Sequence, residues 1–257
     1  MKILKFFYSA IIAVIISTSF SVKAETTIYA THDSTSGSYV DYMKTVYARA
    51  GKPEIMMLSL TSFDKEFNLN GLAAESWSQS DDGLTWTFNL RDNLLWSDGE
   101  TLKASDYIFA LKRAATTGYD FGWYWSFAGG LKNWGPVTDG SMDVDQLGIK
   151  AVNDKTIEVT TETVKPYLPS VVSLWYPVPE HAWKKHGDEY AANVDTMVAS
   201  GPFMLKSWEK STNKMVLVKN PNYNAPWPSM VDTLVVDPTI GPPEVGFPAY
   251  LAGEADM

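Results

Sequence analysis

The clearest periodic stretch of the chain is an alternation of apolar and polar side chains over residues 84–90. Leu84, Trp86, Phe88 and Leu90 occupy every second position, with Thr85, Thr87 and Asn89 between them. Because successive side chains on a strand point to opposite faces, this pattern predicts a half-buried β-strand. Asp81-Asp82-Gly83 predicts the turn before this strand, and Trp96-Ser97-Asp98-Gly99 predicts a second turn after it.

A helical period follows, and it predicts a helix from about residue 105 to residue 115. Its apolar face is formed by Tyr107, Leu111 and Ala114. Ser105 is the predicted N-cap, and Asp106 is favourable in the first turn of a helix. A second helix is predicted over residues 39–50, because Gly51-Lys52-Pro53 would end it.

The remaining apolar runs are short. They predict strands at residues 27–30, 56–60, 148–152, 156–160, 203–208, 215–219 and 231–236. A short helix is predicted at residues 181–186, and another is predicted to start near residue 249 and to be cut off at Met257. The chain is therefore predicted to have a mixed α/β fold in which strands dominate the middle.

Residues 116–135 do not fit either period, and they are unusually rich in aromatic side chains. They contain Tyr119, Phe121, Trp123, Tyr124, Trp125, Phe127 and Trp134, together with five glycines. One interpretation is a helix end that packs on the core. The other is an irregular loop that faces a ligand, since loops carry function and aromatic rings supply contact area.

The first 24 residues have the features of a secretory signal peptide. Lys2 and Lys5 precede an apolar run over residues 6–16, and Val22-Lys23-Ala24 has the form of a cleavage site. The alternative is a membrane anchor, but the apolar run is shorter than the roughly 20 residues that span a bilayer. We therefore predict cleavage after Ala24 and export to the periplasm.

Composition and charge narrow the function further. The chain has no cysteine, so it has no disulfide, no thiolate metal site and no cysteine for a lipid anchor. Its net charge of −9 argues against nucleic acid or an anionic membrane as the partner. These properties favour a soluble exported protein whose stability rests on its apolar core.

Catalytic and metal-binding patterns are weak. The three histidines, His32, His181 and His186, fit no hydrolase or metalloprotease motif. Asp139, Ser141, Asp143 and Asp145 stand at alternate positions as in a calcium loop, but Val144 replaces the required glycine and Lys150 the required glutamate. We expect no metal, no cofactor and no enzymatic activity.

Several motifs occur in a characteristic order and spacing. They are Gly71-Leu72-Ala73-Ala74-Glu75-Ser76-Trp77, residues 80–91, 96–100, 102–114 and 147–152, Ser200-Gly201-Pro202-Phe203, residues 219–223, and Ala249-Tyr250-Leu251-Ala252-Gly253-Glu254. Together they resemble family 5 of the bacterial extracellular solute-binding proteins, which is the oligopeptide-, dipeptide- and nickel-binding group. The resemblance covers about residues 71–257. Lys103 departs from it, because a helix-capping threonine is usual there, and residues 30–70 match poorly.

The resemblance implies a periplasmic-binding-protein-like fold of type II, of mixed α+β class. Domain I would comprise residues 25–45 and 166–257, and a smaller, variable domain II would comprise residues 46–165. Family members continue into a third domain, so the chain is expected to be truncated before domain III. The ligand would lie between domains I and III, and the groups that fix peptide termini would lie largely in domain III.

The implied function is the capture of oligopeptides or dipeptides for the permease subunits of an ABC importer, by a monomer in the periplasm. Two alternatives remain: an oligosaccharide-binding member of the same family, with sugars stacked on Trp123, Tyr124 and Trp125, and a secreted hydrolase. The candidate ligand contacts are Asp33, Ser34 and Ser36 after the first strand, Tyr119, Trp123, Tyr124 and Trp125 as an aromatic wall, and Ser200 and Gly201 where the chain re-enters domain I. For each residue, packing or turn formation is the alternative role.

Overall fold

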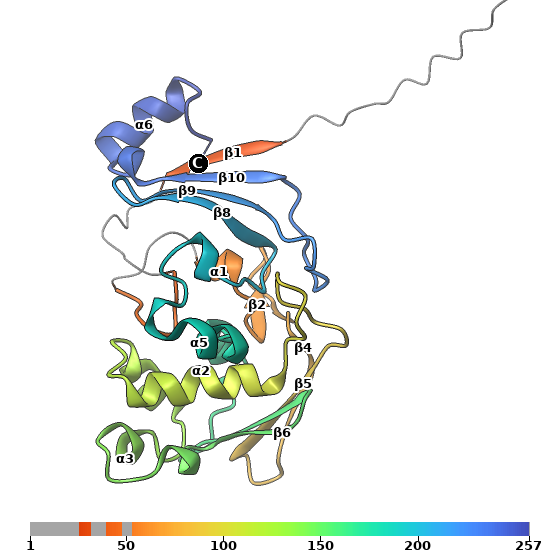
Figure 1. Cartoon of the computed structure of the whole chain (residues 1–257). Helices are drawn as coiled ribbons and strands as arrows, with labels where there is room; N and C mark the ends of the chain where they lie inside the picture. The colour runs from red at the N-terminus through yellow and green to blue at the C-terminus, as the bar shows by residue number, and fades with distance from the viewer. Residues whose placement is uncertain (1–25, 32–39, 48–52, 257) are drawn as a thin grey trace, which may run out of the picture.

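The structure is a computed structural model, and it describes residues 26–31, 40–47 and 53–256 (Figure 1). The predicted signal peptide lies outside the described residues. So do three of the candidate ligand contacts, Asp33, Ser34 and Ser36. Their roles stay predictions.

Two four-stranded sheets organise the described chain. The first has the order β1-β10-β9-β8, formed by β1 (Thr27–Thr31), β10 (Thr233–Asp237), β9 (Lys214–Lys219) and β8 (Phe203–Glu209). The second has the order β4-β5-β7-β6, formed by β4 (Ala74–Gln79), β5 (Thr85–Leu90), β7 (Thr156–Thr160) and β6 (Ile149–Asn153). A hairpin of β2 (Thr61–Phe63) and β3 (Leu69–Gly71) stands beside them. Only β1 and β10 pair in parallel.

Short helices connect and cover the sheets. The α-helices are α1 (Pro53–Met56), α2 (Ala104–Thr116), α3 (Trp134–Thr138), α4 (Leu168–Val171), α5 (Glu180–His186) and α6 (Pro243–Leu251). A π-helix runs over Tyr124–Gly129, and single 3₁₀ turns occur at Val144–Gln146, Val172–Leu174, Gly187–Glu189, Val194–Thr196 and Pro238–Ile240. Figure 1 shows α6 on one side of the first sheet, and α1, α2, α5 and the second sheet on the other.

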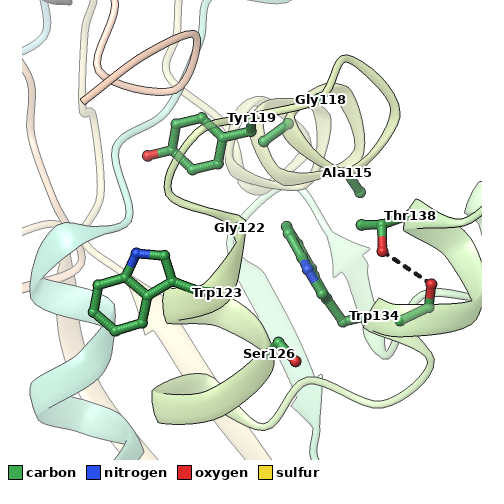
Figure 2. Close-up of a pocket in the computed structure, with 10 residues that line it drawn as sticks. Ala115, Gly118, Tyr119, Gly122, Trp123, Ser126, Trp134 and Thr138 are labelled. Carbon is green, nitrogen blue, oxygen red and sulfur yellow. Dashed lines mark hydrogen bonds between the residues drawn. The ribbon is translucent and has the colours of Figure 1, made fainter. Parts of the chain in front are cut away.

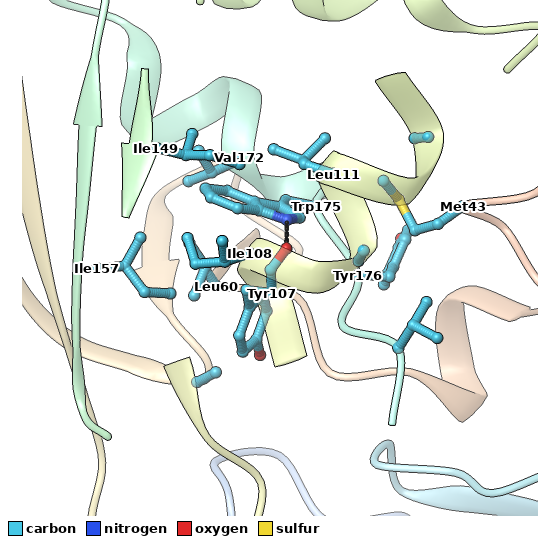
Figure 3. Close-up of a cluster of buried hydrophobic side chains, with 14 of the residues drawn as sticks. Met43, Leu60, Tyr107, Ile108, Leu111, Ile149, Ile157, Val172, Trp175 and Tyr176 are labelled. Carbon is cyan, nitrogen blue, oxygen red and sulfur yellow. Dashed lines mark hydrogen bonds between the residues drawn. The ribbon is translucent and has the colours of Figure 1, made fainter. Parts of the chain in front are cut away.

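The larger core lies between α2 and the second sheet (Figure 3). Tyr107 and Trp175 are fully buried there, and the indole Nε1 of Trp175 donates to the carbonyl of Tyr107 over 2.9 Å. The Tyr107 hydroxyl in turn donates to the carbonyl of Leu58 over 2.5 Å. These bonds satisfy the polar ends of two large aromatic side chains that would otherwise be costly to bury.

A second, smaller core lies under the first sheet. It is formed by Val40, Met56, Ala199, Phe203, Leu205, Met215, Leu217, Leu234 and Val236. Segments far apart in the sequence therefore meet under one sheet. The division of the chain into domains I and II stays a prediction.

Most predicted elements are confirmed. The alternating stretch forms β5, the predicted hairpins form β6–β7 and β8–β9, and the predicted helix at residues 181–186 forms α5. The predicted N-cap Ser105 is wrong, because α2 begins at Ala104 and its cap position is Lys103. There the backbone N–H of Lys103 donates to Asp106 Oδ2 over 2.9 Å, so the acidic side chain does part of the capping.

Three other predicted elements differ from the structure. Residues 40–47 form turns rather than a helix, because their backbone N–H groups bond to side chains elsewhere, as shown below. Residues 57–60 are irregular rather than a strand, since Leu58 donates to Ser200 Oγ and accepts from Tyr107. The last helix, α6, begins at Pro243 and ends at Leu251, earlier than predicted. Tertiary contacts override the local pattern in the first two cases.

Candidate ligand-binding site

Strands β1 and β10 are parallel, so their carboxyl ends lie together at one end of the first sheet, which we term its carboxyl edge. In open α/β sheets, ligands bind beyond the carboxyl ends of parallel strands. Thr31 pairs with Asp237 where both strands end. Asp33, Ser34 and Ser36 follow Thr31 in the sequence and lie outside the described residues. In Figure 1 this edge and α6 lie on the same side of the molecule.

Asp237 holds the turn at the end of β10. Its Oδ1 accepts from the backbone N–H of Thr239 over 3.0 Å and from the Thr239 hydroxyl over 2.6 Å, and its Oδ2 pairs with Lys214 over 2.8 Å. Partial burial opposes ionisation, but these donors lower the pKa of Asp237 below its ordinary value. The turn therefore carries a fixed negative charge that is already paired.

Two exposed aromatic rings lie together at the surface of the aromatic segment. Trp123 Nε1 donates to the Tyr47 hydroxyl over 3.3 Å, and the two residues are 55% and 66% exposed. Phe121 packs edge-on beneath both, with its ring centroid 6.2 Å from that of Tyr47 and 4.9 Å from that of Trp123. We term Tyr47 and Trp123 the aromatic platform, because their polar ends bond to each other while much of each residue remains open to solvent.

Asp120 fixes the chain segment that carries Tyr47. Its Oδ2 accepts from the Thr45 hydroxyl over 2.5 Å and from the backbone N–H of Tyr47 over 3.3 Å, and its Oδ1 accepts from the N–H of Val46 over 2.9 Å. One carboxylate thus holds three donors of one short segment. Asp120 positions the platform rather than forming its surface.

We expect Asp120→Ala to lower the free energy of unfolding by about 1–2 kcal/mol, because three donors lose a charged acceptor at a partly solvated site. The change should also loosen Tyr47 and alter the fluorescence of Trp123. Urea unfolding and tryptophan emission measure both effects, with Trp123→Phe identifying the contribution of Trp123. Asp139→Ala is the matched control, since Asp139 is exposed and bonds only locally to Ser141. Equal effects in the two alanine variants would contradict the positioning role.

The other members of the predicted aromatic wall point inward. Trp125 is fully buried, and Tyr124 donates its hydroxyl to the carbonyl of Val171 over 2.9 Å, while burial raises the pKa of Tyr124 to about 12. Tyr119 is buried as well, and burial raises its pKa well above the usual range. The described contacts of these three side chains are those of core packing. Ligand contact by them stays a prediction.

A pocket of about 320 Å³ lies between the end of α2 and α3 (Figure 2). Its lining residues include Gly118, Tyr119, Gly122, Trp123, Ser126 and Trp134. Figure 2 shows the rings of Trp123 and Trp134 apart from each other, and Trp123 of the platform also lines the pocket. Trp134 is almost fully buried, and the glycines leave main chain exposed around it.

Ser200 and Gly201 lie in a buried backbone junction. The N–H groups of both residues donate to the carbonyl of Met56, over 3.0 Å and 2.8 Å, and Ser200 Oγ accepts from Leu58 over 3.0 Å. A Cβ at position 201 would lie 2.5 Å from the carbonyl oxygen of Ile55, so only glycine fits. This packing explains the Ser-Gly-Pro motif, and ligand contact by these residues stays a prediction.

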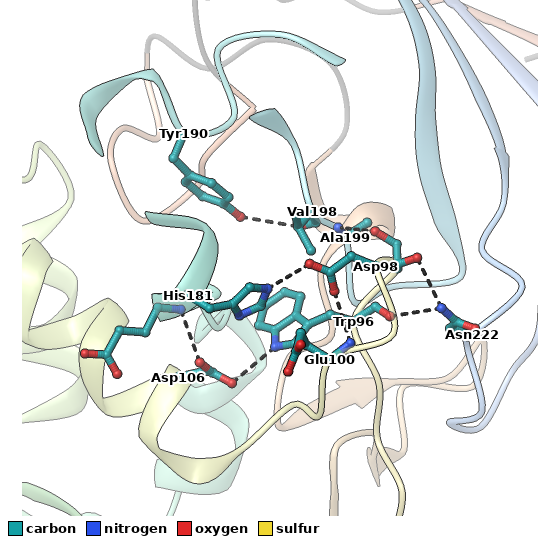
Figure 4. Close-up of polar contacts among 11 residues, drawn as sticks. Trp96, Asp98, Glu100, Asp106, His181, Tyr190, Val198, Ala199 and Asn222 are labelled. Atoms are coloured by element: carbon teal, nitrogen blue, oxygen red, sulfur yellow. Dashed lines mark hydrogen bonds and ion pairs between the residues drawn. The ribbon is translucent and has the colours of Figure 1, made fainter. Parts of the chain in front are cut away.

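The Trp96–Gly99 turn joins this junction to the rest of the chain (Figure 4). Ser97 donates its N–H to the Ala199 carbonyl over 2.7 Å, and Asn222 Nδ2 donates to the carbonyls of Trp96 and Ser97 over 3.2 and 3.1 Å. His181 Nε2 lies 2.8 Å from Asp98 Oδ2. The turn therefore connects α5, the approach to β8 and the loop after β9.

Asp106 is the buried carboxylate of this junction. It accepts from Trp96 Nε1 over 3.2 Å and from the N–H groups of Lys103 and Glu180 over 2.9 and 3.3 Å. Burial raises the pKa of Asp106 above its ordinary value of 3.8, although the three donors act in the opposite direction.

The raised pKa of Asp106 predicts a pH dependence. Its protonation favours the folded state, so the contribution of Asp106 to stability is full below the unfolded pKa and is lost as the pH rises through the folded pKa. Asp106→Asn removes this slope, so the Tm of the variant relative to the wild type should rise as the pH increases from about 4 to about 7. Thermal melts across this range measure the difference, and Asp81→Asn is an exposed control. A difference that is constant with pH would contradict the prediction.

The sequence-based prediction named Trp123 and did not name Tyr47 or Asp120, and ligand contact by Trp123 stays a prediction. Tyr47 falls in a segment that was predicted to be an ordinary helix, and a lone tyrosine carries no signal there. Asp120 is an acidic residue within an aromatic segment. This contrast is the sequence signal that could have indicated a role for Asp120 as a hydrogen-bond acceptor.

A metal-binding cluster and a membrane-spanning helix are not found among the described residues. No three histidine, aspartate or glutamate side chains there gather closely enough to hold a metal ion. No helix there is long and apolar enough to cross a membrane.

The described chain thus combines two four-stranded sheets, one parallel strand pair and an exposed aromatic platform. Residues 68–257 match the family described as bacterial extracellular solute-binding proteins, family 5. The chain belongs to this family.

Individual relatives support the assignment. The chain is 34% identical over 206 residues to the probable deoxycholate-binding periplasmic protein YgiS of Escherichia coli, covering 77% of this chain and 37% of that protein. It is 34% identical over 171 residues to a dipeptide-binding protein of Lactococcus lactis, covering 64% and 30%. The substrate-binding domain of an oligopeptide ABC transporter from Bacillus anthracis superposes with a TM-score of 0.78 at 30% identity, covering 90% of this chain and 45% of that one. The chain thus spans less than half the length of these relatives.

Proposed function

We propose that this chain belongs to the substrate-binding component of an ABC importer and that it captures peptides. The observation that carries the proposal is the family match over residues 68–257. The parallel strand ends and the exposed aromatic platform are two features of the described chain that a peptide could contact. The dipeptide-binding and oligopeptide-transporter relatives support peptides as the ligand class. The permease subunits would be the partners, and the protein would bind without turning over its ligand.

The chemistry of a peptide suits this surface. A short extended peptide needs hydrogen bonds for its backbone and room for variable side chains, and a sheet edge supplies both. The platform offers apolar ring area that accepts side chains of many shapes. The predicted signal peptide supports a periplasmic location.

A second candidate ligand is an amphipathic steroid. YgiS, which carries the name of a probable deoxycholate-binding protein, is among the relatives, and the flat rings of Tyr47 and Trp123 also suit a rigid apolar face. The two candidates share the platform but differ in their polar groups.

A binding assay separates the candidates. Purified protein is tested by thermal shift and calorimetry against di-, tri- and pentapeptide mixtures and against deoxycholate, because a true ligand raises the Tm. We expect peptides to bind and Trp123→Ala to weaken their binding at least tenfold, with mass spectrometry detecting intact peptide and no product. Binding of deoxycholate alone would replace the first candidate by the second. Cleavage of the peptide would contradict both.

A further inference from the structure

A second concave site lies at the other end of the first sheet, between the β2–β3 hairpin and the loop that leads into β10. The pocket has a volume of about 520 Å³, within the range of small-molecule sites. Its lining residues are Phe63, Asp64, Lys65, Glu66, Asn70 and Trp227. Because Trp227 precedes β10, this pocket lies at the amino end of that strand, away from the carboxyl edge described above.

Two aromatic rings line this pocket from separate segments. Phe63 ends β2, and Trp227 lies between Pro226 and Pro228 in the loop. They are 43% and 45% exposed, and both line the pocket. We term this pair the aromatic slot, because the two rings belong to one pocket.

The backbone at Trp227 holds an unusual conformation. Its φ of 60° lies in the left-handed region, which bulky side chains rarely adopt. Such conformations cost free energy and occur where a surrounding structure or a function requires them. The two flanking prolines restrict the backbone of the loop on both sides of Trp227.

The hairpin side of the slot is also rigid. Asp64 Oδ1 accepts from the N–H groups of Glu66 and Asn68, both over 2.9 Å, and its Oδ2 accepts from the side-chain amides of Asn68 and Asn70 over 3.2 and 3.1 Å. The hydrogen bond from the Asn68 backbone is the main cause that lowers the pKa of Asp64. The loop therefore keeps its shape without a ligand.

The polar groups of the pocket indicate a neutral ligand. Asp64 is engaged by four donors of its own loop, and Lys65 pairs with Glu66 over 3.3 Å, so each charged group already has a partner. Two neutral groups stay unengaged by the described residues: the indole N–H of Trp227, which is a donor, and Asn70 Oδ1, which is an acceptor. Flat apolar faces with hydroxyl groups at the rim match this combination of rings, one donor and one acceptor.

We propose that the aromatic slot is a binding site for a neutral sugar ring, separate from the site at the carboxyl edge of β1 and β10. The ring stacks between Phe63 and Trp227, and its hydroxyl groups accept from the Trp227 indole and donate to Asn70. The proposal of a sugar site holds whichever ligand binds at the carboxyl edge of β1 and β10.

The test uses the full chain and trisaccharides of β-linked glucose and of β-linked N-acetylglucosamine, with saturation-transfer NMR and calorimetry as readouts. We expect one of the two trisaccharides to bind the wild type, and we expect Trp227→Gly to lower the affinity for it at least tenfold. Glycine adopts the left-handed conformation freely, so this variant is expected to fold. Phe247→Ala, which removes an exposed ring of α6, should leave sugar binding unchanged.

Two results would overturn the proposal. One is the absence of binding by either trisaccharide to the wild type. The other is equal affinity in the wild type and Trp227→Gly. Binding of benzylammonium in place of the sugars, with the same loss in Trp227→Gly, would assign the slot to organic cations and would also reject the sugar proposal. Peptide binding at the platform is measured in parallel, so failure of either site is distinguished from failure of the other.

Discussion

Asp41→Ala is expected to lower the free energy of unfolding by about 3–5 kcal/mol, because it breaks a buried ion pair from one side. Arg113 Nη2 donates to Asp41 Oδ2 over 2.6 Å, and the two side chains are only 9% and 2% exposed. The variant leaves the guanidinium buried without its counter-charge, and Arg113 Nε already has no partner among the described residues. Met43 also loses the acceptor of its N–H, which Asp41 Oδ1 provides over 3.0 Å. Urea unfolding followed by circular dichroism measures the change.

Two further variants make this result interpretable. Glu180→Ala removes an exposed ion pair with Lys184 within α5, so it should cost about 0.5 kcal/mol. The double variant Asp41→Leu with Arg113→Met removes both buried charges, and it should recover much of the stability that the single change loses. If Asp41→Ala costs no more than Glu180→Ala, the buried pair does not hold residues 40–47 against α2.

Trp125→Ala is expected to cost about 3–5 kcal/mol of folding stability, because it empties a fully buried site. The ring contacts Tyr124 and Trp175, with centroids 5.3 and 6.0 Å away. Trp123→Ala, two positions earlier, should cost about 1 kcal/mol or less, since Trp123 is more than half exposed. Chemical unfolding of the two variants under the same conditions measures the contrast.

Ligand binding should show the opposite order. Trp123→Ala should lower the affinity for the captured ligand at least tenfold, which corresponds to about 1.4 kcal/mol of binding free energy. Trp125→Phe should leave affinity unchanged, because it keeps an aromatic ring in the core and removes an indole N–H that has no partner in the described structure. Equal stability of Trp125→Ala and Trp123→Ala would contradict the burial of Trp125. A loss of ligand affinity in Trp125→Phe but not in Trp123→Ala would show that Trp125 rather than Trp123 faces the ligand.

A helix or strand was predictable where its own residues show a regular spacing of apolar and polar side chains or clear turn residues. The alternation over residues 84–90 identified β5, and the turn residues between the paired apolar runs identified β6–β7 and β8–β9. Residues 40–47 were not predictable in this way. Their backbone N–H groups bond to Asp41 and Asp120, and Asp120 lies more than 70 positions away in the sequence. A local helical pattern contains no information about such partners.

The candidate site shows the same limit. Naming Tyr119, Trp123, Tyr124 and Trp125 as one wall treated consecutive residues as if they shared a face. Each step along a helix turns the next side chain by roughly 100°, so neighbours in this helical segment point in different directions. Trp123 therefore reaches the surface while Trp125 enters the core. The partner of Trp123 is Tyr47, which only the folded chain brings beside it.

The pairing of β1 with β10 has a consequence for how the protein acquires its structure. Thr26 and Asp232, at the start of this pair, are 206 positions apart and bond to each other directly. Contacts between such distant positions require closure of a long loop, which slows folding. The first strand can find its partner only after the chain has been synthesised as far as β10. We therefore expect the second sheet, whose strands are closer together in the sequence, to form before the first sheet.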